Sequence, residues 1–249
     1  MGWIHDRGPD PVPPEVLDRV NYLGAVSTGP DGVHFPPPLD GPQAYLAVQG
    51  AQVDEIPSHF HSVEQFQYVV SGSGTIGSRP FSRGVLHYAD RFTPYGPIKA
   101  GPHGLTYATL RASHDTGVFV MPAGQERLAH LLAVAERPAS VRRQHTVDLG
   151  AALAAAAPSG GSPWTEVCGG GDGFRIAVVA LPARATTPAF TAAGGGAFLI
   201  VMDGTVDAEG GPYGAGALRW HAAGETEPAR AGNGGARLAL LQFPVAISP

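Results

Sequence analysis

The stretch that decides the fold is IPSHFHSVEQFQYVVSGSG, residues 56–74. It places His59 and His61 two positions apart, directly before an aromatic and β-branched run that ends in serine and glycine. Alternate residues of an extended strand point to the same side, so we expect both imidazoles on one face. Gln65 and Gln67 alternate along the next strand, and a side-chain oxygen from there can join the imidazoles. Such a set forms a mononuclear site for Fe, Mn, Ni, Cu or Zn, and the spacing selects none of them.

The segments around this stretch are short, rich in β-branched and aromatic residues, and separated by glycine, proline or serine. Examples are AYLAVQGAQV (44–53), VLHYADRFTPYG (85–96) and LTYATLRAS (105–113). This spacing predicts antiparallel strands in a sandwich or barrel. GQERLAHLLAVAERP (124–138) breaks the pattern, because its leucines recur with a helical period, and we expect an amphipathic helix there.

The second half of the chain repeats the first. FQYVVSGSGTI (66–76) matches FLIVMDGTV (198–206), and AGPHGLTYATL (100–110) matches AGNGGARLALL (231–241), at offsets of 132 and 131 positions. Two matches in one order at nearly one offset indicate a tandem duplication of a β-unit. We therefore expect an N-terminal arm, a first barrel, a helix with a linker and a second barrel, at residues 1–40, 41–122, 123–162 and 163–249.

The histidine segment resembles the first motif of the cupin superfamily, which reads HxH, three or four residues, Glu, six residues, Gly. Here Gln65 stands where Glu is usual, and Gly72 follows at the family's spacing. Some small cupins bind metal through such a glutamine, so the resemblance implies His59, His61 and Gln65 as metal ligands. Glu64 is the competitor, although strand parity turns it away from the histidines.

The second cupin motif, Gly, five residues, Pro-x-Gly, two residues, His, is only partly present. Pro94 and Gly96 fill the Pro-x-Gly positions, but Lys99 stands where the family has histidine. The fourth ligand could be His103, which follows the turn as the family's histidine does, or His87 on the strand before it, or water. Tyr95 and Lys99 flank the expected pocket mouth and are our candidate catalytic residues, and Lys99 would suit an anionic substrate.

The resemblance implies an all-β protein of two tandem cupin barrels, of the double-stranded β-helix or jelly-roll type, joined by a short helical connector. Applying the offset to the second copy puts Thr191, Ala193 and Ala197 where His59, His61 and Gln65 stand. None of these can replace an imidazole, so we expect a degenerate second barrel.

For function, we expect a metal-dependent enzyme that chelates a small organic substrate. An oxygenase or dioxygenase with Fe(II) comes first. The alternatives are a non-redox isomerase, cyclase or lyase with Ni, Mn or Zn as a Lewis acid, and a non-catalytic ligand-binding cupin; Cu is a further possible metal.

Composition limits the other classes of function. The formal net charge is −5 with a pI of about 6.0, and no basic run is present, so we expect no nucleic-acid partner. The longest aliphatic run, FLIVM (198–202), is far too short to span a membrane, and the N-terminus has no apolar signal segment. The single cysteine, Cys168, excludes an intramolecular disulfide. We expect a cytoplasmic bacterial protein, and a homodimer because dimers are common among cupins.

Overall fold

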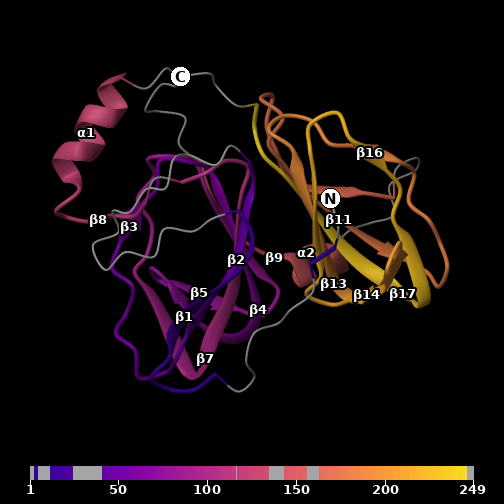
Figure 1. Ribbon diagram of the computed structural model, residues 1–249, viewed down its shortest axis with the longest axis horizontal. Helices are drawn as coiled ribbons and strands as arrows, with labels where there is room; N and C mark the ends of the chain where they lie inside the picture. The colour runs from indigo at the N-terminus through magenta and orange to yellow at the C-terminus, as the bar shows by residue number, and fades with distance from the viewer. Residues whose placement is uncertain are drawn as a thin grey trace. The chain divides into compact units, whose positions relative to one another are not determined.

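The computed structural model in Figure 1 describes residues 3–4, 12–24, 41–115, 117–134, 143–155 and 163–245. The chain divides into two compact units. Within the described residues, the N-terminal unit lies between residues 12 and 147, and the C-terminal unit comprises residues 3–4 and those between 148 and 245.

The N-terminal unit is built on a seven-stranded sheet in the order β1-β2-β7-β4-β6-β9, with β5 paired to β4. A second, two-stranded sheet joins β3 to β8. The strands are β1 (Leu17–Leu23), β2 (Gln43–Gln49), β3 (His59–Phe60), β4 (Gln65–Ile76), β5 (Arg79–Ser82), β6 (Val85–Ala89), β7 (Ile98–Arg111), β8 (Phe119–Val120) and β9 (Gln144–Asp148).

The C-terminal unit repeats this plan with a six-stranded sheet in the order β10-β11-β17-β13-β14, with β15 paired to β13, and a two-stranded sheet of β12 and β16. Its strands are β10 (Thr165–Gly169), β11 (Arg175–Leu181), β12 (Phe190–Thr191), β13 (Ala197–Ala208), β14 (Gly211–Gly214), β15 (Leu218–His221), β16 (Thr226–Glu227) and β17 (Arg230–Gln242). The start of the chain belongs here as well, because Ile4 forms an antiparallel bridge with Leu218.

Two glycines at matching positions show how closely the units correspond. Gly72 in β4 and Gly204 in β13 both have a φ of 73°, where L side chains are strained. A Cβ at Gly72 would lie 2.2 Å from the carbonyl oxygen of Gly104, and a Cβ at Gly204 would lie 2.2 Å from that of Gly235. Both units therefore need glycine where β4 meets β7 and where β13 meets β17, and this supports the predicted duplication.

Strand alternation fixes what faces the interior of the N-terminal unit. The apolar core includes Val69 of β4, Phe81 of β5 and Tyr107 of β7, all buried. Because side chains two apart share a face, Gln65 and Gln67 point to the same interior as Val69. The core thus continues into a polar region near the start of β4.

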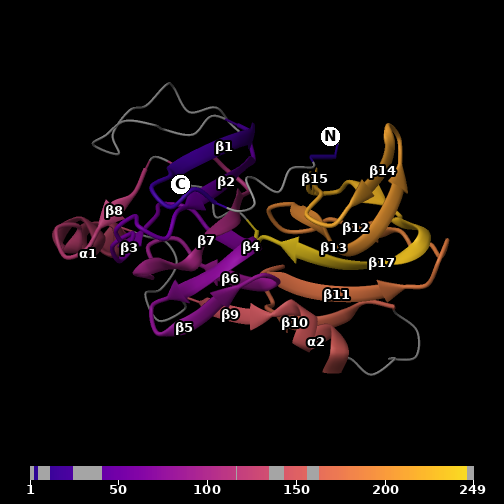
Figure 2. The ribbon, with the colours of Figure 1, turned by 90° about the horizontal axis from the view of Figure 1, so that it is seen from below.

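Two helices complete the described structure, α1 (Gln125–Val134) and α2 (Leu149–Ala155). Figures 1 and 2 show α1 at the end of the N-terminal unit that carries β3 and β8. Leu128 is buried, as the helical period predicts, while Pro138 lies outside the described residues.

Two segments outside the expected barrels belong to the first sheet. Part of the expected N-terminal arm, Leu17–Leu23, forms β1 and pairs with β2. Part of the expected linker forms β9 and joins the first sheet beside β6. The units meet at Val147 and Asp148 rather than at residue 163.

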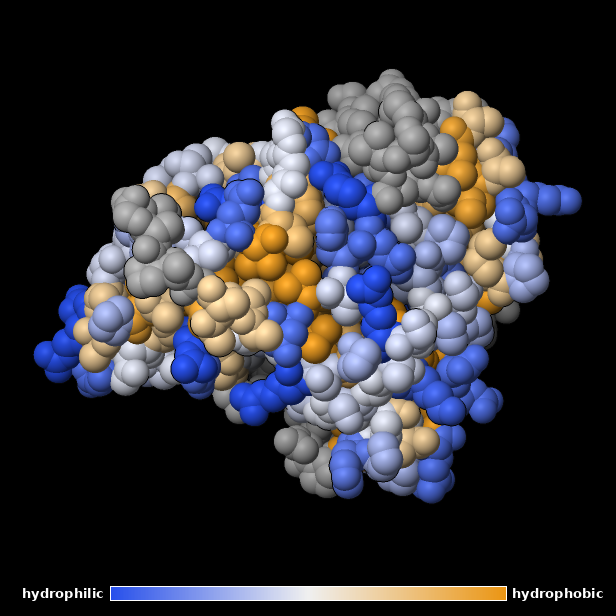
Figure 3. Space-filling view, turned by 180° about the vertical axis from the view of Figure 1, so that it is seen from behind, coloured by the Kyte–Doolittle hydropathy of each residue, from blue (hydrophilic) through white to orange (hydrophobic). Residues whose placement is uncertain are grey.

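On the face drawn in Figure 3, hydrophilic side chains cover most of the surface between smaller hydrophobic areas. Among the described residues, neither helix has the length and apolar character needed to cross a membrane.

Candidate functional site

His59 and His61 lie together in the interior of the N-terminal unit, as their spacing predicts. Their ring centroids are 5.1 Å apart with planes at 90°, and the residues are only 4% and 9% exposed. The backbone of His59 bonds to that of Tyr95 in both directions, at 3.0 and 2.9 Å. This pairing places the Tyr95 ring 4.5 Å from the His59 ring, centroid to centroid.

A directional chain of hydrogen bonds runs through these residues. Arg111 Nε and Nη2 donate to Gln65 Oε1 at 3.1 and 3.0 Å, and Gln65 Nε2 donates to the Tyr95 hydroxyl oxygen. The Tyr95 hydroxyl lies 2.9 Å from His59 Nε2, and His59 Nδ1 lies 2.7 Å from the Pro57 carbonyl oxygen. A guanidinium can only donate and a carbonyl can only accept, so every bond between them has one direction. His59 therefore carries its proton on Nδ1, and its Nε2 lone pair accepts from Tyr95.

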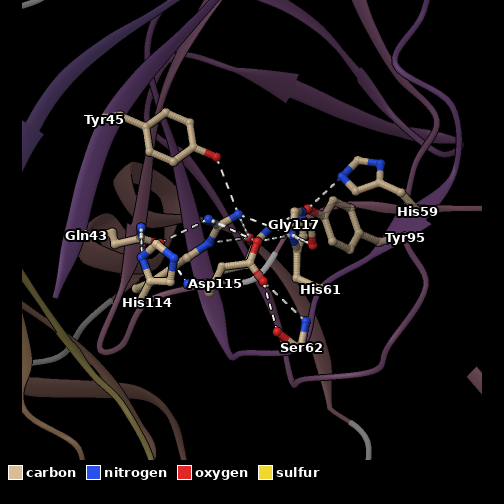
Figure 4. Close-up of polar contacts among 11 residues, drawn as sticks. Gln43, Tyr45, His59, His61, Ser62, Tyr95, His114, Asp115 and Gly117 are labelled. Carbon is tan, nitrogen blue, oxygen red and sulfur yellow. Dashed lines mark hydrogen bonds and ion pairs between the residues drawn. The ribbon is translucent and has the colours of Figure 1, made fainter. Parts of the chain in front are cut away.

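A carboxylate orients the second histidine (Figure 4). His61 Nδ1 lies 2.7 Å from Asp115 Oδ2, while Asp115 Oδ1 accepts from the Ser62 hydroxyl at 3.1 Å. The short contact assigns the ring proton to Nδ1, which leaves a lone pair on Nε2. A carboxylate behind a histidine in this way is the usual support of a metal-ligating imidazole.

Burial keeps both histidines neutral. Desolvation, with a smaller effect of neighbouring His61, lowers the pKa of His59 to about 3. Desolvation is also the largest cause of the lowered pKa of His61, against the opposing effect of Asp115. A neutral imidazole is the form that binds a metal.

Arg111 and Asp115 form a buried ion pair beside the histidines, with Nη1 3.3 Å from Oδ2 and exposures of 3% and 4%. Although burial acts to raise it, Arg111 and then His61 hold the pKa of Asp115 well below its usual value. Arg111 also donates to Gln43 Oε1 at 3.2 Å and to the Tyr45 hydroxyl at 3.4 Å. The two charges offset each other, so the pair adds no net charge to the site.

No protein-family model and no curated protein matches the sequence. Solved structures do match. A putative dioxygenase from Nostoc punctiforme is 10% identical with a TM-score of 0.57 and covers 94% of this chain and 84% of its own. A cupin 2 conserved barrel domain protein from Leptotrichia buccalis is 12% identical with a TM-score of 0.54, over 92% and 89%.

A bacterial pirin from Escherichia coli, in complex with nickel(II), is 12% identical with a TM-score of 0.52, over 92% of this chain and 93% of its own. The chain has the cupin fold. The resemblance drawn from the HxH segment is thus confirmed at the level of fold, and so is the expected all-β class.

The cupin fold implies a metal, and two donors of this chain fit one. His59 and His61 are neutral, and anchoring of each Nδ1 leaves Nε2 as the donor atom. A third imidazole, His87, packs on the Tyr95 ring with centroids 5.1 Å apart. Its Nε2 is buried and has no hydrogen-bond partner among the described residues, and burial lowers its pKa to about 3. His59 and His61 would hold the metal, and His87 is the further imidazole nearby.

Gln65 is the third expected ligand. It lies in the cluster, but both Arg111 bonds hold its oxygen, so its amide nitrogen faces Tyr95. Rotating the amide by half a turn would point its NH₂ group at the donors of Arg111, and no hydrogen bond could form between them. In this structure the glutamine links Arg111 to Tyr95, and metal binding by Gln65 Oε1 stays a prediction.

Three other candidates lie outside the cluster. His103 and Lys99 are exposed residues of β7, and Lys99 pairs with Thr75 near the far end of β4. Glu64 is partly exposed and lies 3.8 Å from the Arg91 guanidinium. The structure therefore places His103 and Lys99 away from the histidine cluster, while Tyr95 is buried beside His59.

Sequence reasoning missed Arg111 and Asp115. Strand parity was the available signal for Arg111, since Tyr107, Thr109 and Arg111 alternate in one strand, and an arginine on a core-facing position is unusual. Asp115 follows the strand in a loop, where sequence periodicity gives no direction.

The corresponding positions of the second barrel carry no imidazole. Thr191 is exposed and its hydroxyl lies 2.8 Å from that of Thr226, while Ala197 is buried in β13. The motif positions of the C-terminal cupin unit therefore lack metal-binding groups.

Proposed function

We propose that the N-terminal cupin unit is a mononuclear metal-dependent enzyme acting on a small organic substrate, with an oxygenase reaction as the first assignment. His59 and His61 are the metal ligands of this proposal, through Nε2. A bound divalent metal supplies Lewis acidity and, as Fe(II), the capacity to activate dioxygen. A substrate with two neighbouring oxygens, such as an α-hydroxy acid, an α-keto acid or a catechol-like diol, suits the positions that two protein ligands leave open.

The observation that carries this proposal is the anchoring of both Nδ1 atoms, at 2.7 Å to Pro57 O and at 2.7 Å to Asp115 Oδ2. It fixes the tautomers before any ligand binds. Because burial depresses both pKa values, no proton has to be removed from either ring at neutral pH. The donor atoms are thus ready without rearrangement of the protonation state.

Arg111 and Tyr95 have supporting roles in this proposal. Arg111 holds Gln65, and Gln65 holds Tyr95 with its hydroxyl on His59. Burial raises the pKa of Tyr95 well above 10, so the phenol keeps its proton at neutral pH. That proton caps the Nε2 lone pair of His59 and competes with a metal for it. Once displaced, the same hydroxyl can donate to a substrate oxygen.

The reaction class is tested by oxygen uptake of the full chain after loading with Fe(II) under anaerobic conditions. We expect substrate-dependent oxygen consumption with one of the chelating classes named above, and its loss in the His61→Ala variant. The exposed His103→Ala variant is the matched control and should retain the rate. Oxygen consumption that survives His61→Ala would overturn the assignment. Activity with Ni, Mn or Zn and without oxygen would instead identify an isomerase, cyclase or lyase, and binding without turnover a ligand-binding cupin.

A further inference from the structure

The C-terminal unit contains a second constellation of metal-ligating groups, away from the motif positions. We propose that His221, Glu225 and Glu227 form a divalent cation site in this unit, independent of the first. Each offers one ligand atom, and these atoms all lie within 4.8 Å of one another.

His221 is the observation that points to a ligand. It is the last residue of β15 and is only 1% exposed, yet neither ring nitrogen has a hydrogen-bond partner among the described residues. Buried polar groups are nearly always paired, because an unpaired one pays its full desolvation cost. Burial, with the Arg219 charge as the next cause, lowers the pKa of His221 to about 4, so the ring is neutral at pH 7. A neutral, buried imidazole with a free lone pair can bind a metal.

The carboxylates stand at a suitable distance. Glu227 Oε2 lies 3.8 Å from His221 Nδ1, too far for a hydrogen bond. A metal with bonds of about 2.1 Å to nitrogen and oxygen can link two atoms that are up to about 4.2 Å apart. The histidine and this carboxylate therefore already lie within the span of one ion. The three ligand atoms lie up to 4.8 Å apart, so one side chain would move by about half an ångström for all three to bind one ion.

A cavity opens beside these groups. Its volume is about 170 Å³, and His221, Glu227 and Arg219 line it together with the aromatic rings of Trp3 and Phe190. This is ample for an ion with its remaining water ligands, since one water takes about 30 Å³. The exposed Asp207 and Glu209 add negative charge to the lining, which favours a cation over an anion.

This site does not occupy the cupin motif positions. Across the β13–β15 ladder, His221 pairs with Ala197, which corresponds to Gln65 in the repeat. Ala89 is the partner of Gln65 in the N-terminal unit, so His221 stands where that unit has alanine. The second barrel is degenerate at its motif and carries this different set of donors instead.

Arg219 would compete with a metal ion for the two carboxylates. Its Nη2 lies 2.6 Å from Glu227 Oε2 and 4.0 Å from Glu225 Oε1. The guanidinium neutralises the carboxylates that a metal would use, and a like charge about 4 Å away weakens cation binding. Removing this charge should tighten metal binding, an effect opposite to what a purely structural ion pair would give.

The test is a Zn²⁺ titration of the full chain, followed by isothermal calorimetry, in the His59→Ala/His61→Ala background. That background lacks the histidines of the first proposed site. Any Zn²⁺ that it binds is therefore bound elsewhere, and this result does not depend on whether the first site binds metal. We expect one Zn²⁺ per chain, at least tenfold weaker binding after Glu227→Gln, and about tenfold tighter binding after Arg219→Gln. Circular dichroism shows whether each variant is folded, and His103→Ala in the same background is the matched control.

Two results would overturn the proposal. One is the absence of Zn²⁺ binding in the background variant, and the other is binding that Glu227→Gln leaves unchanged. Tightening by Arg219→Gln together with loss in His221→Ala would locate the ion at these residues.

Discussion

Replacing Arg111 with methionine is expected to destabilise the N-terminal unit by about 3–5 kcal/mol. Breaking a buried ion pair at one partner leaves an uncompensated charge, and that penalty has this size. Methionine occupies much of the space of the aliphatic part of arginine but supplies none of its hydrogen-bond donors. The buried carboxylate of Asp115, which is 4% exposed, would keep its hydrogen bonds to His61 and Ser62 but lose its countercharge.

The matched comparison is a double-mutant cycle with Asp115→Asn. Asparagine keeps an oxygen that can accept from His61 and carries no charge. We expect Arg111→Met and Asp115→Asn to cost less together than the sum of the single changes, by about 2 kcal/mol or more. The offset follows from the 3.3 Å ion pair, whose two charges are removed at once in the double variant.

Urea unfolding followed by far-UV circular dichroism measures these changes, and tryptophan fluorescence supplies an internal control. All three tryptophans, Trp3, Trp164 and Trp220, belong to the C-terminal unit. We expect the fluorescence transition to stay near its wild-type midpoint. Additive costs in the cycle would refute the reasoning, because they would mean that the two charges do not stabilise each other.

Three further predictions concern separate parts of the chain. Stability should fall as pH drops from about 6.5 towards 3, because the pKa values of His59 and His87 are lowered to about 3 and the unfolded chain takes up these protons first. The free energy of unfolding should change by about 1.4 kcal/mol per pH unit for each histidine. Denaturation at several pH values should therefore give a shallower pH dependence for His87→Leu than for the wild type. Gly204→Ala should cost about 2–4 kcal/mol in unfolding free energy, because its φ is 73° and the new Cβ would lie 2.2 Å from a carbonyl oxygen. Gly224→Ala, at a φ of 84° with open space around it, should cost only about 1 kcal/mol, and equal costs would contradict the packing argument. Tyr95→Phe should raise the affinity for Zn²⁺ in a calorimetric titration by about fivefold, since it removes the competing hydroxyl from His59, whereas a drop would mean that the phenol oxygen is itself a ligand.

The fold was largely predictable because its signals are local and repeated. The two-residue spacing of His59 and His61 predicted that both face one side, and the repeat of Gly72 at Gly204 indicated the duplication. Both are properties of strand geometry that a single sequence carries.

The site was predictable only in part, because its partners come together through tertiary structure. The proximity of the two histidines follows from their spacing, but the Gln65 oxygen accepts hydrogen bonds from Arg111 of the neighbouring strand β7, which the spacing does not indicate. Asp115 reaches His61 from a loop 54 residues away in sequence. His103 was favoured only because it follows the turn, as the family's histidine does, but it lies at the bulged pairing of β7 and is exposed. In the second unit, the repeat offset indicated Thr191, Ala193 and Ala197 as the motif positions, and it gave no sign of the donors around His221.

The central claim is that His59 and His61 hold a metal in the N-terminal unit, and metal analysis of the purified full chain tests it most directly. Elemental analysis of the wild type should find bound divalent metal, after reconstitution where needed. The His59→Ala/His61→Ala variant should bind one metal fewer per chain, while His103→Ala should match the wild type. Equal metal content in the wild type and the double variant would contradict the account.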